Sequence, residues 1–439
     1  MPSPRKSFFP ILIFAISLCV PSIARADDVT EWNQEMLRAG IVGGTAAVVM
    51  TRVAAIVQAS VFDAVNGIDR KYAPVHVAPN AAAGASRRAA AVQAAYSALV
   101  ALYPAQKSTF DARLVISLAA IASDPHESAA SIASGIVWGT TAANGIVTWR
   151  STDGFTPTST PPDFKGGNAL GEWRPTPPAF AFGIHPELAT TTPWVLSTPS
   201  QFRPNGPPAL TSARYATDFN ETKLMGKSNS VVRTTNQTIY SWFWQVATAT
   251  YLWNHAADVL IDRRARGDEE DDSGYWGERR HALLESARIL ALLDIAMADA
   301  AIACWDAKYL YVAWRPVTAI PLETTIGNAG ITHSASDDTW MPLFATPAHP
   351  EYPSAHSSIS GAAVAVLAAV FGDRTLFTMD YDALIGVTRS FRSFSQALDE
   401  VKDARVFAGI HFRFSCDDGT TLGDQVGNYV LDHALLPAD

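Results

Sequence analysis

Apolar residues recur at helical spacing over most of the chain, which predicts a largely helical protein. Before residue 150 this spacing predicts helices at residues 32–66, 86–102, 108–122 and 127–149. After residue 210 it predicts helices at residues 212–225, 236–262, 279–311, 354–371, 381–393, 395–408 and 419–435. Alternation at strand period is scarce, so we expect an all-α fold in which helical bundles pack together.

Two long stretches interrupt this pattern. Residues 151–210 are rich in Pro, Gly and Thr, and a second loop covers residues 316–353. Loops of this length inside a compact domain are usually functional or are wrap-around connections. The first loop also contains aromatic residues such as Trp173 and Phe180, so we expect it to be packed. We divide the chain into an N-terminal helical region, residues 27–210, and a C-terminal helical domain, residues 211–439.

The first 26 residues are typical of a secretory signal peptide. Arg5 and Lys6 precede an apolar run over residues 8–20, and Ala24 and Ala26 frame a small-x-small cleavage site. The run is short for a membrane span, which needs about 20 residues. A retained N-terminal anchor is the alternative. We expect cleavage and export to the periplasm or the medium, with no membrane span in the mature chain.

Composition excludes several classes of protein. The 439 residues are 48% hydrophobic and carry a formal net charge of −9, without a block of Lys and Arg, so no nucleic-acid partner is expected. Three cysteines are too few for a disulfide scaffold or a Cys-built zinc module. Neither a P-loop nor a dinucleotide-binding glycine motif is present.

Lys308 and Arg315 are the first candidates for chemistry. They are seven residues apart, a spacing that returns to nearly the same face of a helix, and both are embedded among apolar residues. Two cations on one face can reach one anion. A solvated basic face is the alternative.

A second candidate follows in the segment from His349 to His356. Pro353 closes a loop, and Ser354 is a good N-cap for the next helix, whose free N–H groups favour an anion. His356 is placed to give or take a proton there. An ordinary capped helix with a half-exposed histidine is the alternative.

A third pair, Arg405 and His411, is six residues apart and does not share a helical face. Gly409 suggests that the helix ends or bends between them, which allows both side chains to converge. The alternative is an unrelated surface arginine and a histidine at the edge of the core.

Taken in this order, Lys-x6-Arg-Pro, Pro-Ser-x-His and Arg-x5-His resemble the signature of the vanadium-dependent haloperoxidase and type 2 phosphatidic-acid phosphatase superfamily. The stretches Cys-Trp-Asp-Ala-Lys-Tyr from Cys304 and Ala-Gly-Ile-His-Phe-Arg-Phe from Ala408 look like its bacterial haloperoxidase branch. So do Trp-Arg-Pro-Val-Thr-Ala-Ile from Trp314 and Pro-Pro-Ala-Leu-Thr-Ser from Pro207. The similarity covers roughly residues 200–435 and implies that family's helical fold.

The resemblance implies roles for individual residues. Lys308, Arg315 and Arg405 match the cations that neutralise the oxygens of vanadate, or of phosphate in the phosphatases. His411 matches the histidine bonded to vanadium, or the nucleophile on phosphorus, and His356 matches the acid–base histidine.

Further matches complete the expected site. Ser354 and the backbone N–H of Ala355 match hydrogen-bond donors to the anion, and Trp305 matches a tryptophan beside it. His349 stands where bromide-oxidising algal members carry histidine and a chloride-oxidising fungal member carries phenylalanine, which implies a preference for bromide and iodide.

The sequence also departs from the family pattern in two places. Ala355 replaces the usual glycine between Ser and His, which keeps the N–H but adds a methyl group. Ser415 stands where many phosphatase members carry the acid that orients the last histidine, so the orienting partner of His411 is in doubt.

The resemblance therefore implies an exported haloperoxidase that binds vanadate and oxidises bromide or iodide with hydrogen peroxide through peroxovanadate. A soluble acid phosphatase with a histidine nucleophile, with phosphate in the same site, is the first alternative. A non-catalytic anion-binding helical protein is the second. A small organic acceptor and a homodimer are both compatible with the sequence.

Cys304 lies one helical turn before Lys308, and Cys416 lies five residues after His411. If Lys308 and His411 meet at one anion, the two sulfurs come close enough for a disulfide in an oxidising compartment. Two buried free thiols are the alternative.

Overall fold

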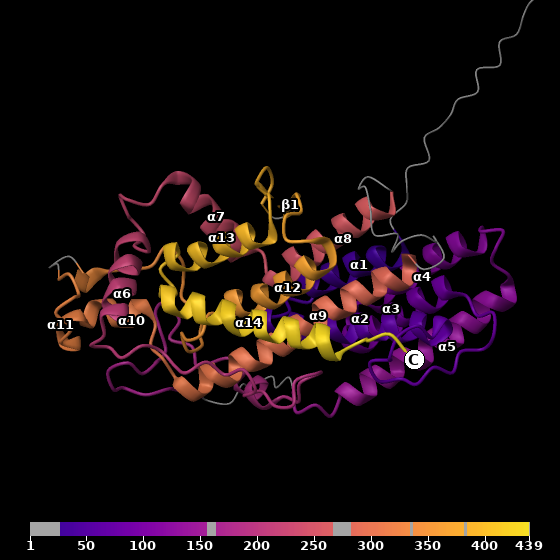
Figure 1. Cartoon of the computed structure of the whole chain (residues 1–439), viewed down its shortest axis with the longest axis horizontal. Coiled ribbons are helices and arrows are strands. Elements are labelled where there is room, and N and C mark those ends of the chain that lie inside the picture. The colour runs from indigo at the N-terminus through magenta and orange to yellow at the C-terminus, as the bar shows by residue number, and fades with distance from the viewer. Residues whose placement is uncertain (1–26, 156–163, 267–281, 334–336, 382–383, 439) are drawn as a thin grey trace, which may run out of the picture.

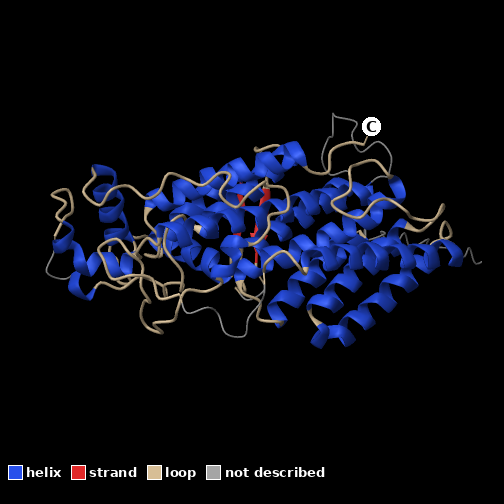
Figure 2. Ribbon diagram, turned by 90° about the horizontal axis from the view of Figure 1, so that it is seen from below, coloured by secondary structure: helices blue, strands red, loops and turns tan. Residues whose placement is uncertain are grey.

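The computed structural model describes residues 27–155, 164–266, 282–333, 337–381 and 384–438. Within these ranges helices dominate and the only sheet is a two-stranded hairpin, so the predicted all-α fold is confirmed. Figure 2 shows how small the hairpin is beside the helices. The predicted signal peptide at residues 1–26 lies outside the described residues.

Five helices form the N-terminal bundle, which gathers at one end of the elongated molecule (Figure 1). They are α1 (Asp28–Val42), α2 (Ala47–Asp69), α3 (Arg87–Leu102), α4 (Lys107–Ala122) and α5 (Ala129–Arg150). The prediction of one helix over residues 32–66 was wrong, because the chain breaks between Gly43 and Ala46. Gly44 adopts a left-handed conformation with φ of 60°, which ends α1 and redirects the chain into α2.

After the first long loop come α6 (Ala213–Met225), α7 (Thr235–Val246) and α8 (Ala249–Ala265), of which α6 lies far from the N-terminal bundle and α8 packs against its helices α1 and α2 (Figure 1). The sequence pattern predicted one helix over residues 236–262. The structure instead separates α7 from α8 at Ala247, which is extended, and Thr248 caps α8 by accepting a hydrogen bond from the backbone N–H of Tyr251.

Helix α9 (Ala282–Tyr311) joins the two halves. It is 30 residues long and buried around nearly its whole circumference, as expected for a helix that is apolar on all sides. It packs against α2 of the N-terminal bundle and against α12 (Ala355–Phe371) and α14 (Arg413–His433) of the C-terminal bundle. Helices α9, α12 and α14 run through the middle of the molecule in Figure 1.

The C-terminal bundle also contains α13 (Phe394–Phe407) and an antiparallel hairpin of β1 (Phe377–Asp380) and β2 (Thr388–Phe391). The helix predicted at residues 381–393 was therefore wrong, although residues 382–383 lie outside the described part. In β1 buried and exposed residues alternate, and Phe377 pairs with Phe391 across the hairpin. Burial of these rings stabilises the hairpin.

Helices α12 and α14 approach each other closely because glycines of α14 face α12. A Cβ at Gly423 would lie 2.1 Å from the carbonyl oxygen of Ser358, and one at Gly419 would lie 2.8 Å from that of Ser354. Any larger residue would separate the helices. Their contact holds the start of α14 beside the start of α12.

The long loops are irregular, as predicted, and contain only short helical turns. These turns are η2 (Pro186–Thr190), α10 (Pro316–Ala319), η3 (Ile320–Leu322), α11 (Glu323–Ile326) and η4 (Asp337–Thr339), while η1 (Pro104–Gln106) links α3 to α4. Packing of the first loop is uneven, since Trp173 is buried while Phe180 is exposed.

By length and composition, helix α2 is apolar enough to cross a membrane. We had expected no such segment after the first 26 residues. Helix α2 lies mostly buried against α3, α5 and α9. Its apolar character is therefore satisfied inside the protein.

Candidate active site

Lys308 and Arg315 are held by one segment of the second loop. Helix α9 ends at Tyr311, so Arg315 lies beyond it and the predicted shared helical face does not exist. Instead, Lys308 Nζ donates to the carbonyl oxygens of Pro350 and Glu351 at 2.8 and 2.9 Å. Arg315 Nε donates to the carbonyl oxygen of His349 at 3.0 Å. Both cations are fully buried.

Ser354 caps α12, as the sequence predicted. Its side chain accepts from the backbone N–H of Ser357, and its own N–H donates to Ser415 O at 3.0 Å. His356 lies in the first turn of α12, beside the cavity described below. The loop and the helix start thus bring Ser354, Ala355 and His356 to the end of α12 that carries the positive partial charge.

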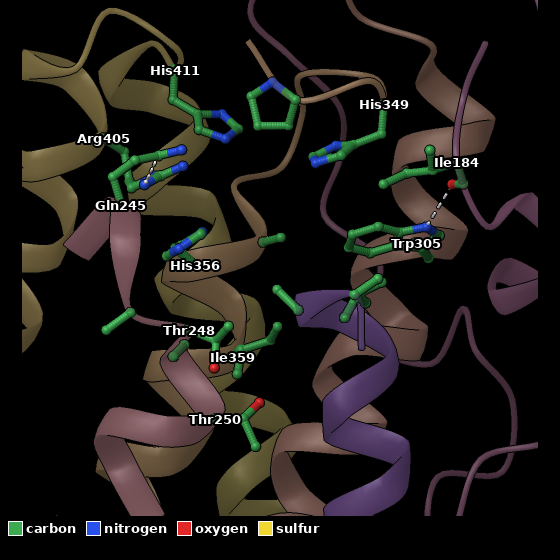
Figure 3. A pocket seen from close by; sticks show the side chains of 17 residues that line it. Ile184, Gln245, Thr248, Thr250, Trp305, His349, His356, Ile359, Arg405 and His411 are labelled. Carbon is green, nitrogen blue, oxygen red and sulfur yellow. Dashed lines mark hydrogen bonds between the residues drawn. The ribbon is translucent and has the colours of Figure 1, made fainter. Parts of the chain in front are cut away.

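Arg405 and His411 converge across the end of α13. That helix ends at Phe407, and Gly409 follows with φ of 76°. A Cβ at Gly409 would lie 2.4 Å from the carbonyl oxygen of Gly226, so glycine is required there for space as well as for conformation. The turn directs His411 back toward the side where Arg405 lies (Figure 3).

Glu351 is the partner of His411 that sequence reasoning missed. His411 Nδ1 lies 2.8 Å from Glu351 Oε1, whereas Ser415 Oγ is 3.4 Å from the same nitrogen. Arg315 Nη1 lies 3.1 Å from His411 Nε2. Glu351 lies between the two prolines of the His349–His356 segment, so the sequence offered a candidate acid before His411 as well as after it.

These residues surround a cavity of about 200 Å³, shown in Figure 3. Six of the predicted site residues line it, namely Trp305, His349, Ala355, His356, Arg405 and His411. Lys308, Arg315 and Ser354 lie behind this lining. The breaks between helices that the sequence pattern missed also reach the cavity, through Ala46 at the start of α2 and through Thr248 at the start of α8.

His349 and Trp305 form one side of the cavity. Their rings lie 5.1 Å apart, and Arg315 Nη2 is 3.0 Å from His349 Nδ1. Trp305 Nε1 donates to the carbonyl oxygen of Ile184 at 3.4 Å, away from the cavity, as Figure 3 shows. Trp305 therefore offers its ring surface to the cavity.

The site carries more buried positive than negative charge. Burial lowers the pKa of Lys308 to about 7, of Arg315 to about 10 and of Arg405 to about 9. Burial also raises the pKa of the Glu351 carboxyl to about 7. At neutral pH the two arginines stay charged, and at most one carboxylate faces them.

The three histidines of the site are neutral. Burial lowers the pKa of His349, His356 and His411 well below the usual range, and the neighbouring cations lower it further. A neutral imidazole can offer a lone pair to a metal, which an imidazolium cannot.

The donor set fits a multiply charged oxyanion such as vanadate. Arg405 Nε is buried and has no hydrogen-bond partner among the described residues, and buried cations without a compensating charge are costly. An oxyanion would satisfy both the surplus charge and the free donor.

The predicted disulfide is absent. Cys304 and Cys416 are buried free thiols in the structure. Cys304 Sγ lies 3.6 Å from the carbonyl oxygen of Pro353. Burial raises the pKa of the Cys416 thiol to about 12, which makes it unreactive.

Part of the sequence and the fold as a whole resemble known proteins. Residues 288–438 match a family model described as the VCPO second helical-bundle domain. No curated protein sequence matches the chain. Among solved structures, the chain is similar to a bacterial vanadium-dependent iodoperoxidase, with a TM-score of 0.77 and 26% identity over 94% of this chain and 97% of that one.

The chain is also similar to a bacterial vanadium-dependent chloroperoxidase in its holo and apo forms. The TM-scores are 0.65 and 0.67, both at 17% identity, over 88% of this chain and 91% and 92% of the others. At this identity the likeness shows the fold alone. The chain is thus a helical-bundle protein with a buried cationic site. Residues 288–438 resemble the second helical-bundle domain of that family model, and the whole chain shares the fold of these vanadium-dependent peroxidases.

Proposed function

We propose that this protein is an exported vanadium-dependent haloperoxidase that oxidises bromide and iodide with hydrogen peroxide. The observation that carries the proposal is the surplus of buried cations around one cavity that a neutral His411 also lines. The likeness to solved vanadium-dependent peroxidases supports the same reaction. Export is inferred from residues 1–26 alone.

Vanadate would be held by Lys308, Arg315 and Arg405, with Ser354 and the N–H of Ala355 at the start of α12. His411 would supply the bond to vanadium through Nε2. When bound, vanadate supplies Lewis-acid activation of peroxide. Phosphate has the same shape and charge and can compete for the cations.

His356 is the group that moves the proton. It lines the cavity, and its pKa lies well below the usual range because it is buried beside Arg405 and Lys308. A bound oxyanion would offset these positive charges and raise that pKa toward neutrality. His356 can then exchange a proton with peroxide, as halide oxidation by peroxide requires.

The size of the cavity favours small inorganic reactants. About 200 Å³ lies below the range of roughly 300–1,000 Å³ in which drug-sized ligands bind. Trp305, Ile359 and other apolar residues line it, which keeps the site dry. A halide and peroxide need little room beside an oxyanion.

The test uses purified apoprotein with and without orthovanadate. We expect halide oxidation that requires vanadate, peroxide and bromide or iodide together. Hydrolysis of a phosphate monoester that vanadate inhibits would instead identify an acid phosphatase. Anion binding without either activity would identify a non-catalytic protein.

A further inference from the structure

Glu351 contacts the back of His411, although sixty residues separate them in the chain. Its side chain is fully buried. Its Oε1 atom lies 2.8 Å from His411 Nδ1 and accepts a second hydrogen bond, at 3.0 Å, from the backbone N–H of Phe412. One oxygen therefore contacts both the imidazole ring and the backbone next to it.

These contacts determine which nitrogen of His411 carries the proton. Arg315 Nη1 lies 3.1 Å from His411 Nε2. A guanidinium group can only donate, so Nε2 of the neutral ring holds the lone pair and Nδ1 carries the proton, which it donates to Glu351 Oε1. The hydrogen bond made by one imidazole nitrogen sets the role of the other.

The same short segment positions the cations. The carbonyl oxygens of His349, Pro350 and Glu351 hold Arg315 and Lys308. The Glu351 side chain adds His411 to this arrangement. A displacement of the segment would thus move all three groups together.

Ser415 is a weak substitute at this position. Its hydroxyl is uncharged, and its Oγ lies 3.4 Å both from His411 Nδ1 and from the carbonyl oxygen of Glu351. Because Ser415 already lies near the His411 ring, an aspartate at position 415 would place its carboxylate close to Nδ1. The chain therefore contains a site at which the orienting acid can be reintroduced.

We propose that Glu351 is the positioning residue of His411: it holds the ring with Nδ1–H bound to its carboxylate and Nε2 directed to the anion. The proposal rests on the proposed function only in naming vanadium as the atom that Nε2 would meet. An acid that accepts from the far ring nitrogen of a histidine ligand orients the ring and raises its basicity.

The first measurement follows the Nδ1–H proton by NMR in apoprotein labelled with ¹⁵N-histidine. A strongly hydrogen-bonded imidazole N–H gives a downfield signal, which the His411→Ala variant assigns by its loss. We expect this signal to disappear in Glu351→Ala and to return in the Glu351→Ala, Ser415→Asp double variant. A signal that persists in Glu351→Ala would overturn the proposal.

The second measurement compares two anions by calorimetry. Glu351→Ala is expected to weaken orthovanadate binding by about 10–100-fold, the usual cost of losing an outer-shell partner of a metal ligand. Inorganic phosphate, which uses the cations and needs no bond to His411, should change by a few-fold at most. Ser415→Asp should restore vanadate binding in the double variant. Unchanged vanadate affinity, or equal loss of both anions, would contradict the positioning role.

Asp218→Ala is the matched control. Asp218 Oδ2 accepts a hydrogen bond from the backbone N–H of Phe414 at 2.9 Å. Phe414 lies two residues after Phe412, whose N–H donates to Glu351. Unlike Glu351, Asp218 has no contact with the His411 ring. This variant should keep both the NMR signal and vanadate affinity. Loss of either would show that the effect of Glu351→Ala comes only from losing a hydrogen bond to the backbone. Wild-type protein that keeps the signal but prefers phosphate to vanadate would refute the proposed function and leave the positioning role in place.

Discussion

Two buried clusters, one beside the middle of α9 and one beyond its C-terminal end, compensate buried charge in opposite ways. In the middle of the helix, Asp294 accepts a hydrogen bond from Asn254 Nδ2 at 2.7 Å. Asp258 lies near it and accepts from Asn33 Nδ2 at 2.9 Å. Burial raises the pKa of Asp294 to about 8 and that of Asp258 well above its usual range. Asp294 is therefore largely protonated and neutral near pH 7, and burial favours the neutral form of Asp258 as well.

At the C-terminal end of α9 the buried charges are cations. Arg315 and Arg405 keep a pKa above neutrality even when buried, at about 10 and about 9. Guanidinium groups do not release a proton near pH 7. Glu351 alone cannot balance them and Lys308.

The sign of the buried charge therefore distinguishes a structural cluster from a ligand-binding site. A buried acid can discharge itself by protonation, so an acid-rich cluster needs no ligand. A buried arginine cannot, so a cation-rich cluster beside a cavity requires an anion. The acidic residues do not line that cavity, whereas Arg405 does.

The largest expected effect separates the two histidines of the cationic cluster. His356→Ala should lower turnover by about 10²–10⁴-fold, because a proton-transfer group is lost, while most vanadate binding remains. His411→Ala should instead remove vanadium fixation, with a loss of more than about 100-fold, since losing even an outer-shell partner costs that much. Metal analysis after dialysis and steady-state assays measure both. Equal vanadium content in wild type and His411→Ala would refute the assignment.

A smaller effect tests the charge surplus. Arg405→Met should weaken phosphate and vanadate binding by about 10–100-fold, because one of the charge-assisted donors is lost. The melting temperature should stay the same or rise, since an apolar side chain of similar length replaces a poorly compensated buried charge. Calorimetry and thermal unfolding give the two readouts. A large fall in melting temperature with unchanged anion affinity would mean that Arg405 is structural.

The acidic cluster should respond to pH and not to anions. The folded-state pKa of Asp294, about 8, is raised above its unfolded value of 3.8. The stabilisation from its bound proton is thus complete below pH 3.8 and is lost as pH rises through about 8. Asp294→Asn removes this titration, so relative to wild type the variant should gain roughly 3–4 kcal/mol between pH 5 and pH 8. Denaturant unfolding at both pH values measures this difference, and a pH-independent difference would argue against the protonated acid.

The smallest expected effect concerns the choice of halide. Wild-type protein should oxidise bromide and iodide with little oxidation of chloride, and His349→Phe should shift the ratio toward chloride, because an aromatic wall leaves a drier site. Bromination and chlorination of a phenolic dye at fixed peroxide measure the ratio. Robust chlorination by wild type, or a ratio unaffected by the substitution, would defeat the idea. Because Arg315 Nη2 lies 3.0 Å from the His349 ring, vanadate affinity should be measured in parallel.

Helix positions and the order of the charged motifs could be predicted from sequence because both are local. Helical spacing predicted α3, α4, α5 and α6 closely, and Ser354 was correctly predicted as the cap of α12. Predictions went wrong where tertiary packing overrides local pattern. The breaks before α2 and α8 and the hairpin at residues 377–391 are such places.

The helical class, the three pairs of charged and histidine residues and the turn at Gly409 that lets Arg405 and His411 converge can all be read from local sequence. Which segments meet depends on the packing of the folded chain. Glu351 and His411 come together because glycines of α14 let that helix approach α12, and no local pattern encodes a contact across sixty residues. The helix breaks at Gly44 and Ala247 likewise depend on the tertiary structure, since only in the folded chain do the residues at these breaks line one side of the cavity. Local preferences act over a few residues, whereas a buried site is assembled by packing between distant helices.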